Sequence, residues 1–194
     1  MKFTRIPATT FEELQMNAGI MASAFTPSTG TLDDSDILGA TTGGLTVTAV
    51  PEYADMGEDI DNCPKNTKEL KKITGWTITA SGTLVTTKAA TTKKLLAAAD
   101  VSGNKITPRM DLAAADFGDI WVVGDYSDKN GATNGGFIAC HIINALSTGG
   151  FSLVTSDGEK GQFAFEFTGH TSINAQDTVP FEMYVQAGSA EPTT

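Results

Sequence analysis

The feature that most constrains this chain is a succession of short stretches in which apolar and polar residues alternate, separated by turn residues. Between residues 76 and 85, the even positions carry Trp, Ile, Ala, Gly and Leu, whereas the odd positions carry Thr, Ser and Val. A period of two residues is typical of a β-strand with one buried face. Leu45, Val47 and Ala49 alternate with threonines in the same way. The pattern predicts an all-β fold of two packed antiparallel sheets, a β-sandwich or a barrel-like variant of one.

The second half of the chain continues this pattern. The segment 137–146 is apolar at nearly every position, so we expect both of its faces to be covered. The glycine-rich segment 127–136 has the composition of a turn. We expect consecutive antiparallel hairpins built from strands over residues 120–126, 137–146, 151–155, 163–168 and 179–185.

One helix is expected to flank the sheets. Residues 88–100 are rich in Ala, Lys and Leu, which favour a helix. Thr86 or Thr87 can cap its N-terminus, and Ser102-Gly103-Asn104 is suited to ending it. With 194 residues, the chain has the length of a single domain spanning residues 1–194.

Two segments are long for connections within a compact domain. Residues 25–44 are polar, glycine-rich and without periodicity, so residues 1–44 are predicted to form an N-terminal strand and an extended arm. Residues 52–72 form a second long loop, and loops of this length are commonly functional. Acidic residues precede basic ones in this loop, so it could pair with the same loop of identical neighbours. A solvated loop with scattered charges is the alternative.

The charge balance excludes several classes of function. There are 13 Lys and Arg residues against 23 Asp and Glu residues, which gives a formal net charge of −10. Such a surface repels phosphate, which argues against reading or packaging nucleic acid and against docking on anionic lipid. No run approaches the roughly 18 apolar residues of a transmembrane helix, and the first residues do not resemble a signal peptide. We therefore expect no membrane partner.

Residues that could support catalysis or bind a metal are few. The chain has two histidines, His141 and His170, and two cysteines, Cys63 and Cys140, and none has the spacing of a metal site or a catalytic motif. Residues 128–131 resemble part of a calcium loop, but the first and twelfth ligand positions would be aromatic. We expect no enzyme, no metal and no cofactor, and we expect both thiols to be unpaired.

The chain also contains a series of distinctive phrases in a fixed order. These are FEELQMNAGI at 11–20, ATTGG at 40–44, GEDIDNCPKNTKELKK at 57–72, GWTITASGT at 75–83, FGDIWVVGDYSDKNG at 117–131, NALSTGGF at 144–151, KGQFAFEFTGH at 160–170 and AQDTVPFE at 175–182. Together they resemble the major tail tube proteins of long, non-contractile-tailed bacteriophages, particularly those of Gram-positive hosts. The resemblance extends over almost the whole chain and includes no catalytic signature.

The resemblance implies a structural virion protein with a β-sandwich flanked by one helix. Six copies would form a ring, and rings would stack into a hollow tube around a tape measure protein. DNA would later pass through the lumen without specific binding. The protein would assemble in the host bacterial cytoplasm, reside in the phage tail, and contact tail terminator and distal tail or tip proteins. Some relatives carry a C-terminal immunoglobulin-like domain, which we expect to be absent because the sequence ends soon after Val185.

In this family, the N-terminal arm and the long loop make contacts between subunits and between rings, and these elements correspond here to residues 1–44 and 52–72. A competing interpretation is a carbohydrate-binding or adhesin-type β-sandwich. That function requires exposed aromatic residues on a concave face or a calcium loop, and the sequence indicates neither. The candidate subunit-interface residues are the charges of the long loop, Glu58, Asp59, Asp61, Lys68, Lys71 and Lys72.

Overall fold

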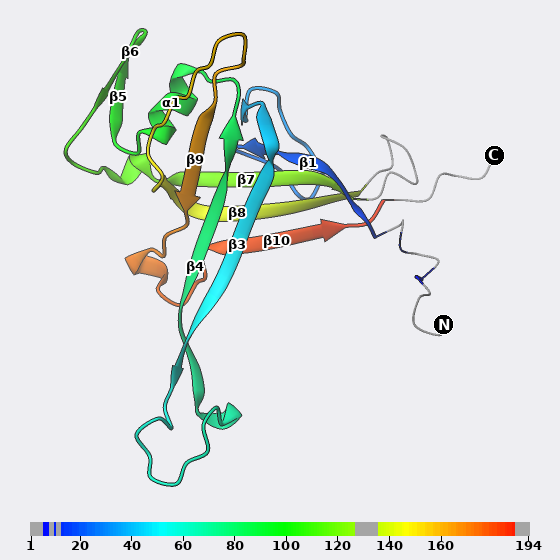
Figure 1. Cartoon of the computed structure of the whole chain (residues 1–194), viewed down its shortest axis with the longest axis vertical. Helices are drawn as coiled ribbons and strands as arrows, with labels where there is room; N and C mark the ends of the chain where they lie inside the picture. The colour runs from blue at the N-terminus through cyan, green and yellow to red at the C-terminus, as the bar shows by residue number, and fades with distance from the viewer. Residues whose placement is uncertain (1–5, 8–9, 11–12, 127–135, 189–194) are drawn as a thin grey trace.

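The structure, a computed structural model, describes residues 6–7, 10, 13–126 and 136–188. Within these ranges the chain is mostly β-strand with one α-helix, and the strands form antiparallel sheets (Figure 1). The predicted fold class is therefore confirmed. The expected turn at 127–136 and the calcium-loop-like residues 128–131 lie outside the described residues, apart from Gly136.

The first layer of the sandwich contains the strands that run horizontally in Figure 1. Its strand order is β2-β1-β7-β8-β10, and every neighbouring pair is antiparallel. The strands are β1 (Gln15–Ala22), β2 (Ile37–Gly39), β7 (Gly118–Tyr126), β8 (Gly136–Ser147) and β10 (Phe181–Gln186).

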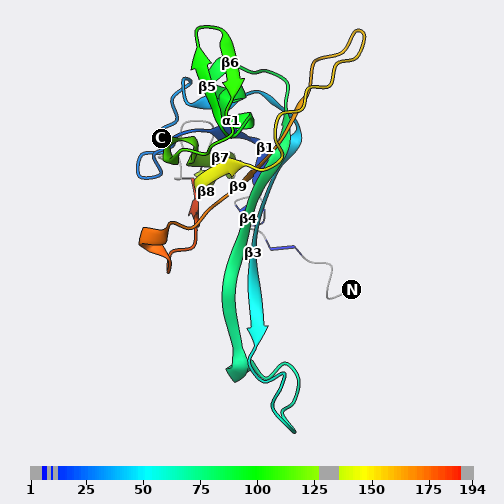
Figure 2. The same cartoon turned by 90° about the vertical axis from the view of Figure 1, so that its left-hand side faces the viewer.

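The second layer crosses the first and contains the two longest strands (Figures 1 and 2). Its order is β9-β4-β3, again antiparallel, and β3 lies at the end of the sheet. The strands are β3 (Thr41–Asp55, 15 residues), β4 (Lys71–Leu84, 14 residues) and β9 (Phe163–Thr168).

Strand β8 joins the two layers at a sharp corner. Up to Ile142 it pairs with β10, whereas its last two residues pair with β9. Between them Asn144 has φ 50°, a left-handed conformation that Asn tolerates better than most residues. Its backbone N–H donates to Asp119 Oδ1 (3.1 Å), and its Nδ2 donates to the His170 carbonyl (3.2 Å). These bonds hold the bend by which the strand leaves one layer and enters the other.

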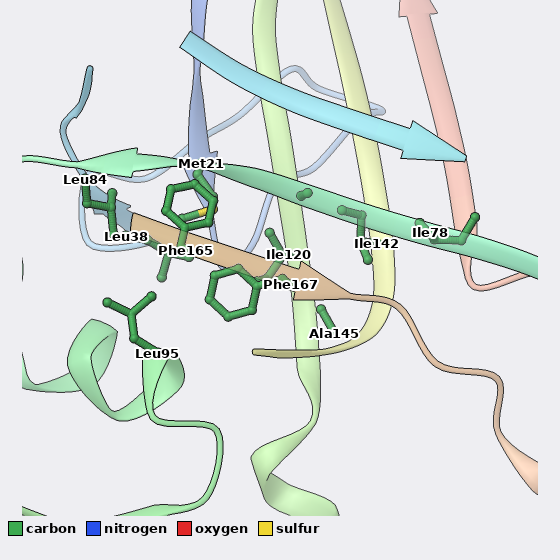
Figure 3. Packing of buried hydrophobic residues seen from close by; sticks show 11 residues of the cluster. Met21, Leu38, Ile78, Leu84, Leu95, Ile120, Ile142, Ala145, Phe165 and Phe167 are labelled. Carbon is green, nitrogen blue, oxygen red and sulfur yellow. The ribbon is translucent and has the colours of Figure 1, made fainter. Parts of the chain in front are cut away.

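The main core fills the space between the layers and is closed on one side by the helix (Figure 3). Phe165 and Phe167 of β9 lie at its centre, with Leu95 of the helix below them. Burying such a side chain contributes roughly 1.5–3 kcal/mol. The cluster consists of Met21, Leu38, Ile78, Ala80, Leu84, Leu95, Ile120, Ile142, Ala145, Phe165 and Phe167.

The outer face of the first layer carries a second, smaller apolar cluster. The segment 23–36, between β1 and β2, packs Phe25 and Leu32 over Trp121 and Ala139. The Phe25 ring centroid lies 5.6 Å from that of Trp121. Both faces of β8 are therefore covered, as predicted. Within the arm or loop predicted over residues 1–44, the segment 25–36 is a loop packed on the first layer through Phe25 and Leu32, and β2 and the start of β3 follow it.

The helix is shorter than predicted. Helix α1 spans Ala89–Leu95, whereas a helix over 88–100 was expected. It ends because Ala97 takes a left-handed conformation (φ 59°) and the chain then enters a small hairpin. Gly103, expected to end the helix, has φ 63° and lies in the turn of that hairpin. The hairpin strands are β5 (Ala99–Ser102) and β6 (Lys105–Pro108).

The predicted helix caps are also wrong. Lys88 is the N-cap residue, and it makes no side-chain capping bond. The Thr87 hydroxyl instead lies 2.9 Å from that of Thr92, and the Thr86 hydroxyl accepts a hydrogen bond from the Ala40 N–H (2.8 Å). Thr87 thus bonds to the first turn of the helix, and Thr86 bonds to Ala40, the residue before β3.

Two buried hydroxyls fix the helix to the sheets. Thr91 Oγ1 donates to the Leu38 carbonyl (2.6 Å), and Ser147 Oγ donates to the Leu95 carbonyl (2.9 Å). The first bond links α1 to β2, and the second satisfies a carbonyl at the end of the helix that has no intrahelical partner. The short helix is therefore positioned by specific bonds as well as by Leu95.

The last strands depart from a simple series of hairpins. Strand β10 pairs with β8, not with the preceding β9, because the chain crosses over between Gly169 and Pro180. The strand expected at 151–155 is reduced to one bridge between Val154 and Gln162. Three short 3₁₀ turns complete the described structure: η2 (Lys68–Leu70), η3 (Ala114–Asp116) and η4 (Ile173–Ala175).

Candidate assembly surface

The most conspicuous feature of the molecule is a hairpin that projects far beyond the sandwich. The distal halves of β3 and β4 leave the body together and end in a looped tip (Figures 1 and 2). Antiparallel pairing continues along them as far as Asp55 and Lys71. We call residues 50–76 the arm, and residues 56–70 within it the tip.

One face of the arm carries apolar side chains that lie beyond the core and are partly to largely exposed. Pro51 pairs with Trp76, and Tyr53 pairs with Ile73. By alternation along β3, these residues lie on the face that carries Ala49 and the core farther along the strand. Trp76, Ile73 and Tyr53 are 38%, 48% and 60% exposed. We call Pro51, Tyr53, Ile73 and Trp76 the apolar strip, and it continues the core face of the sheet beyond the core.

The opposite face of the arm is predominantly polar. Glu52 accepts hydrogen bonds from the hydroxyl of Thr77 at its carboxylate (2.9 Å) and from that of Thr74 at its carbonyl (3.2 Å). Val50 is an exposed apolar residue of this face. The arm is thus amphipathic, although its apolar side has no partner layer.

The tip has a defined internal structure. The Asp55 carboxylate accepts hydrogen bonds from the N–H groups of Gly57 (3.1 Å) and Asn66 (3.3 Å), which draws the two sides of the loop together. The Met56 N–H also donates to the Leu70 carbonyl (3.0 Å). The long loop predicted over 52–72 is accordingly shorter, since both of its ends belong to the β3–β4 ladder.

A small contact inside the tip explains its shape. A Cβ atom added to Gly57 would lie 2.7 Å from Leu70 Cδ1 and 2.8 Å from Cys63 Sγ. Gly57 therefore lies close against Leu70 and Cys63, and a larger residue there would displace the ends of these two side chains. Cys63 is a free thiol in this contact, and Cys140 in β8 is also free.

The six charged residues predicted from the sequence all lie on the arm. Glu58, Asp59, Asp61 and Lys68 belong to the tip, whereas Lys71 and Lys72 begin β4. The structure does not bring the acidic and basic groups together. In the described part of the arm, the one ion pair is between Lys68 and its neighbour Glu69 (3.4 Å), and both side chains are well exposed. These charges are thus available to another molecule.

The outer edge of β3 is a further surface without a partner. β3 ends the strand order, so its second edge makes no ladder with any described strand. From Thr41 to Pro51 it has no charged residue, and natural edge strands usually carry charges to prevent pairing. Gly43 and Gly44, with φ 76° and 84°, form a bulge near its start. The remaining edge is an available template for another strand.

Sequence reasoning missed the apolar strip. Trp76 was predicted to lie on the core face of a strand, which is correct. Its exposure could not be predicted, because it depends on where the first layer ends. Tyr53 fell inside the predicted loop, and Ile73 fell between that loop and the strand predicted from residue 76. The signal that could have found them is the apolar alternation of β3, which runs on through Ala49 and Pro51 to Tyr53.

A separate polar cluster surrounds His141 on the outer face of the first layer. Its Nε2 lies 3.0 Å from Asp119 Oδ2, and its Nδ1 lies 3.1 Å from Glu182 Oε2. The ring stacks on Trp121 at a centroid distance of 3.9 Å. These contacts of His141 with Asp119 and Glu182 tie β7, β8 and β10 together.

The hydrogen bond from the Tyr184 hydroxyl (2.7 Å) and then that from His141 hold the pKa of Glu182 below its ordinary value. The same bond to Glu182 raises the pKa of Tyr184. No group of three His, Cys, Asp or Glu residues suited to a metal ion occurs among the described residues. We assign this cluster a structural role, as a polar tie across three strands.

Among the described helices, none is both long and apolar enough to span a membrane. No protein-family model matches the chain, and no curated protein is significantly similar to it.

Proposed function

We propose that this chain is the major tail tube protein of a long, non-contractile-tailed bacteriophage, in which six copies form a ring and rings stack into a hollow tube. The observation that carries this proposal is the apolar strip, which extends a core face beyond the body of the subunit. Exposed apolar surface of this kind marks sites of protein interaction. The phrase-by-phrase resemblance to this family suggests that the interacting protein is another copy of the same chain.

Ring formation requires that two different surfaces of one chain meet, in a heterologous contact whose rotation closes. The free edge of β3 and the apolar strip supply such surfaces. Strand pairing between neighbours would remove the edge and would turn six separate layers into a closed wall. The proposal therefore assigns a contact between subunits to both the free edge of β3 and the apolar strip.

The surface chemistry suits a conduit. With a net charge of −10, the subunit has little affinity for the phosphates of passing DNA. Thr77, Thr79 and Thr83 alternate with core residues on β4 and present small hydroxyls on its outer face. In this proposal the protein is a structural component of the virion tail and has no enzymatic activity. Its further partners are the tape measure protein and the proteins at the two ends of the tail.

Electron microscopy of the purified protein tests the proposal directly. Stacked rings or tubes are expected for the unchanged chain. Tyr53→Ser combined with Ile73→Ser should abolish these assemblies, because each substitution removes an apolar side chain of the apolar strip. Val50→Ser is the matched control on the opposite face of the arm, and it should still assemble. Monodisperse monomers of the unchanged protein at high concentration would contradict the proposal.

The alternative, a carbohydrate-binding module, is favoured by one observation. Tyr53 and Trp76 lie on one face of the arm and are both exposed, and aromatic faces of this kind can bind sugars. Affinity electrophoresis through a panel of soluble polysaccharides would test it. Retardation of a monomer that is lost in Trp76→Ala would favour carbohydrate binding, whereas rings without retardation would favour the tube.

A further inference from the structure

Both histidines of the chain are linked to Asn144, the residue at the corner in β8. The sequence has two histidines, one within β8 and one just after β9. His170 Nδ1 lies 3.2 Å from the Asn144 carbonyl oxygen, and Asn144 Nδ2 donates to the His170 carbonyl (3.2 Å). His141 acts through Asp119, whose Oδ2 lies 3.0 Å from the ring Nε2 and whose Oδ1 accepts the Asn144 N–H (3.1 Å). One histidine therefore contacts the carbonyl of the corner residue, and the other is linked to its N–H.

The two contacts differ in the number of ring protons that they require. A carbonyl oxygen only accepts hydrogen bonds, so the contact of His170 needs one N–H, at Nδ1, which a neutral ring can supply. His141 is different, because its Nδ1 also lies 3.1 Å from Glu182 Oε2. Ionised carboxylates only accept as well, so both contacts of His141 are hydrogen bonds only when both ring nitrogens carry a proton. A neutral His141 would direct a lone pair at one of the two carboxylates.

Three elements bring charged groups to this contact. Asp119 comes from β7 and Glu182 from β10, and the His141 side chain between them is only 13% exposed. The hydrogen bonds from Tyr184 and then from His141 lower the pKa of Glu182, so this carboxylate is ionised over the range in which histidines titrate. Lys94 of α1 also faces Asp119; burial lowers the pKa of this lysine, and the attraction of Asp119 opposes that effect. Asp119 thus faces two basic side chains, and His141 is the one that contacts it directly.

We propose that the corner between the two layers is proton-sensitive and that His141 is its sensor. With both nitrogens protonated, His141 holds Asp119 where its other oxygen accepts the Asn144 N–H. The Tyr184 hydroxyl holds Glu182 in place (2.7 Å), so a ring that loses one proton keeps its bond to Glu182 and releases Asp119. Histidine changes its charge between pH 5 and 8, so the bond at the corner is firm on the acid side of this range and weakens as the pH rises. This inference goes beyond the proposed tube, because every group that it involves belongs to one subunit.

Hydrogen exchange of two adjacent backbone N–H groups tests this inference. The Asn144 N–H donates to the Asp119 carboxylate, whereas the Ile143 N–H donates to the Pro180 carbonyl (3.0 Å), which does not titrate. NMR of dilute, unassembled protein gives the protection factor of each group, in which the intrinsic pH dependence of exchange is divided out. The protection factor of Asn144 should fall about tenfold between pH 6 and pH 8, because a bond to a charged group is weakened, whereas that of Ile143 should stay constant.

Constant protection of Asn144 over this range would overturn the inference. An equal fall at Ile143 would also overturn it, because the whole corner would then open without a separate contribution from the carboxylate. Neither result depends on whether the protein forms rings, so the proposed function is tested separately by electron microscopy.

Three variants assign the effect to one histidine. His141→Gln has no titrating ring, so the protection of Asn144 should be the same at both pH values. In Glu182→Gln, the amide can donate to an unprotonated Nδ1 of His141, which leaves Nε2 to donate to Asp119, so protection should persist to pH 8. This second variant decides the question if His141→Gln does not fold, which circular dichroism shows. His170→Asn is the matched control, because it keeps a side-chain N–H donor and should keep the full pH dependence. Loss of the dependence in His170→Asn, or its persistence in either of the other variants, would overturn the assignment to His141.

Discussion

The sandwich and the arm are made from the same two strands, yet they differ in what covers them. Where β3 and β4 cross the first layer, Ile78 and Leu84 are fully buried, and Val47 packs against the same cluster. A few residues farther along the same face, Trp76 and Tyr53 are exposed. The alternation of β3 continues into the arm, whereas on β4 a register shift at Thr74 brings Ile73 opposite Tyr53. Whether an apolar face serves folding or association therefore depends on where the opposing layer stops.

The largest loss of folding stability is expected when an aromatic side chain of the main core is truncated. Phe167 is 2% exposed and lies at the centre of the main core (Figure 3). Phe167→Ala should lower the free energy of unfolding by about 3–5 kcal/mol, through lost burial and a cavity. Urea denaturation followed by circular dichroism measures it. A loss below about 1 kcal/mol would mean that this cluster does not hold the layers together.

A smaller effect is expected where α1 is fixed to the body. Thr91→Val keeps the volume but removes the donor to the buried Leu38 carbonyl. The unsatisfied carbonyl should cost about 1–3 kcal/mol. Thr92→Val, at a partly exposed neighbouring position on the same helix, makes the same change in helix propensity and removes an exposed hydroxyl bond to Thr87, so it is the control for a bond outside the core. Equal losses in the two variants would show that the buried bond makes no separate contribution.

A pH-dependent effect is expected at the polar tie around His141. The pKa of Glu182 is lowered in the folded state, so its charged form stabilises the fold above its unfolded-state pKa. That stabilisation is lost as the pH falls through the lower, folded-state pKa. Glu182→Gln should therefore be less stable than the unchanged protein at pH 7, by less than about 1 kcal/mol because the group is half-exposed.

Urea denaturation at pH 7 and again in strong acid measures this dependence, and the difference between the two proteins should shrink in acid. Glu159→Gln, at an exposed residue of the segment between β8 and β9, is the control for replacing a carboxylate by an amide. A constant difference for Glu182→Gln would show that the amide perturbs packing rather than removing a charge.

The smallest effect on folding is expected in the arm. Tyr53→Ser and Ile73→Ser should each change the free energy of unfolding by no more than about 1 kcal/mol, because both side chains are about half-exposed and lie opposite each other as one cross-strand pair outside the core. Denaturation of dilute protein, where no assembly occurs, measures it. A loss comparable to that of Phe167→Ala would remove the distinction between the two regions.

Much of this fold could be predicted from the residue pattern, because burial on one face produces a period of two. The faces of residues 77–84 and 45–49 follow directly from it, as does the double burial of β8. The end of the helix could not be predicted, since it depends on long-range contacts. Asp100 forms an ion pair with Arg109 (2.9 Å), and Arg109 also binds Asp116 (2.6 Å). These contacts accompany the β5–β6 hairpin, so residues 99 and 100 belong to a strand although their types favour a helix.

The candidate surface was only partly predictable for a similar reason. Charges of the tip are evident in the sequence because no partner residue is needed to recognise them. The apolar strip is different, since Tyr53 and Ile73 become a surface only when the first layer ends before reaching them. The pairing of β10 with β8 could not be predicted either, because alternation indicates which face of a strand is buried but not which strand lies beside it.

The bend in β8 at Asn144 has a mechanical consequence for the far end of the molecule. β8 pairs with the second layer through its last two residues, so the corner sets the direction in which the whole β3–β4 hairpin points. At about 3.3 Å per residue, the six residues from Val50 to Asp55 alone form a lever of roughly 20 Å. A rotation of about 5° at the corner would then displace the end of β3 by roughly 2 Å, about half the spacing between paired strands. The precision with which Asn144 and its two hydrogen-bonding neighbours, Asp119 and His170, hold this angle thus limits how accurately a distant contact can be aligned.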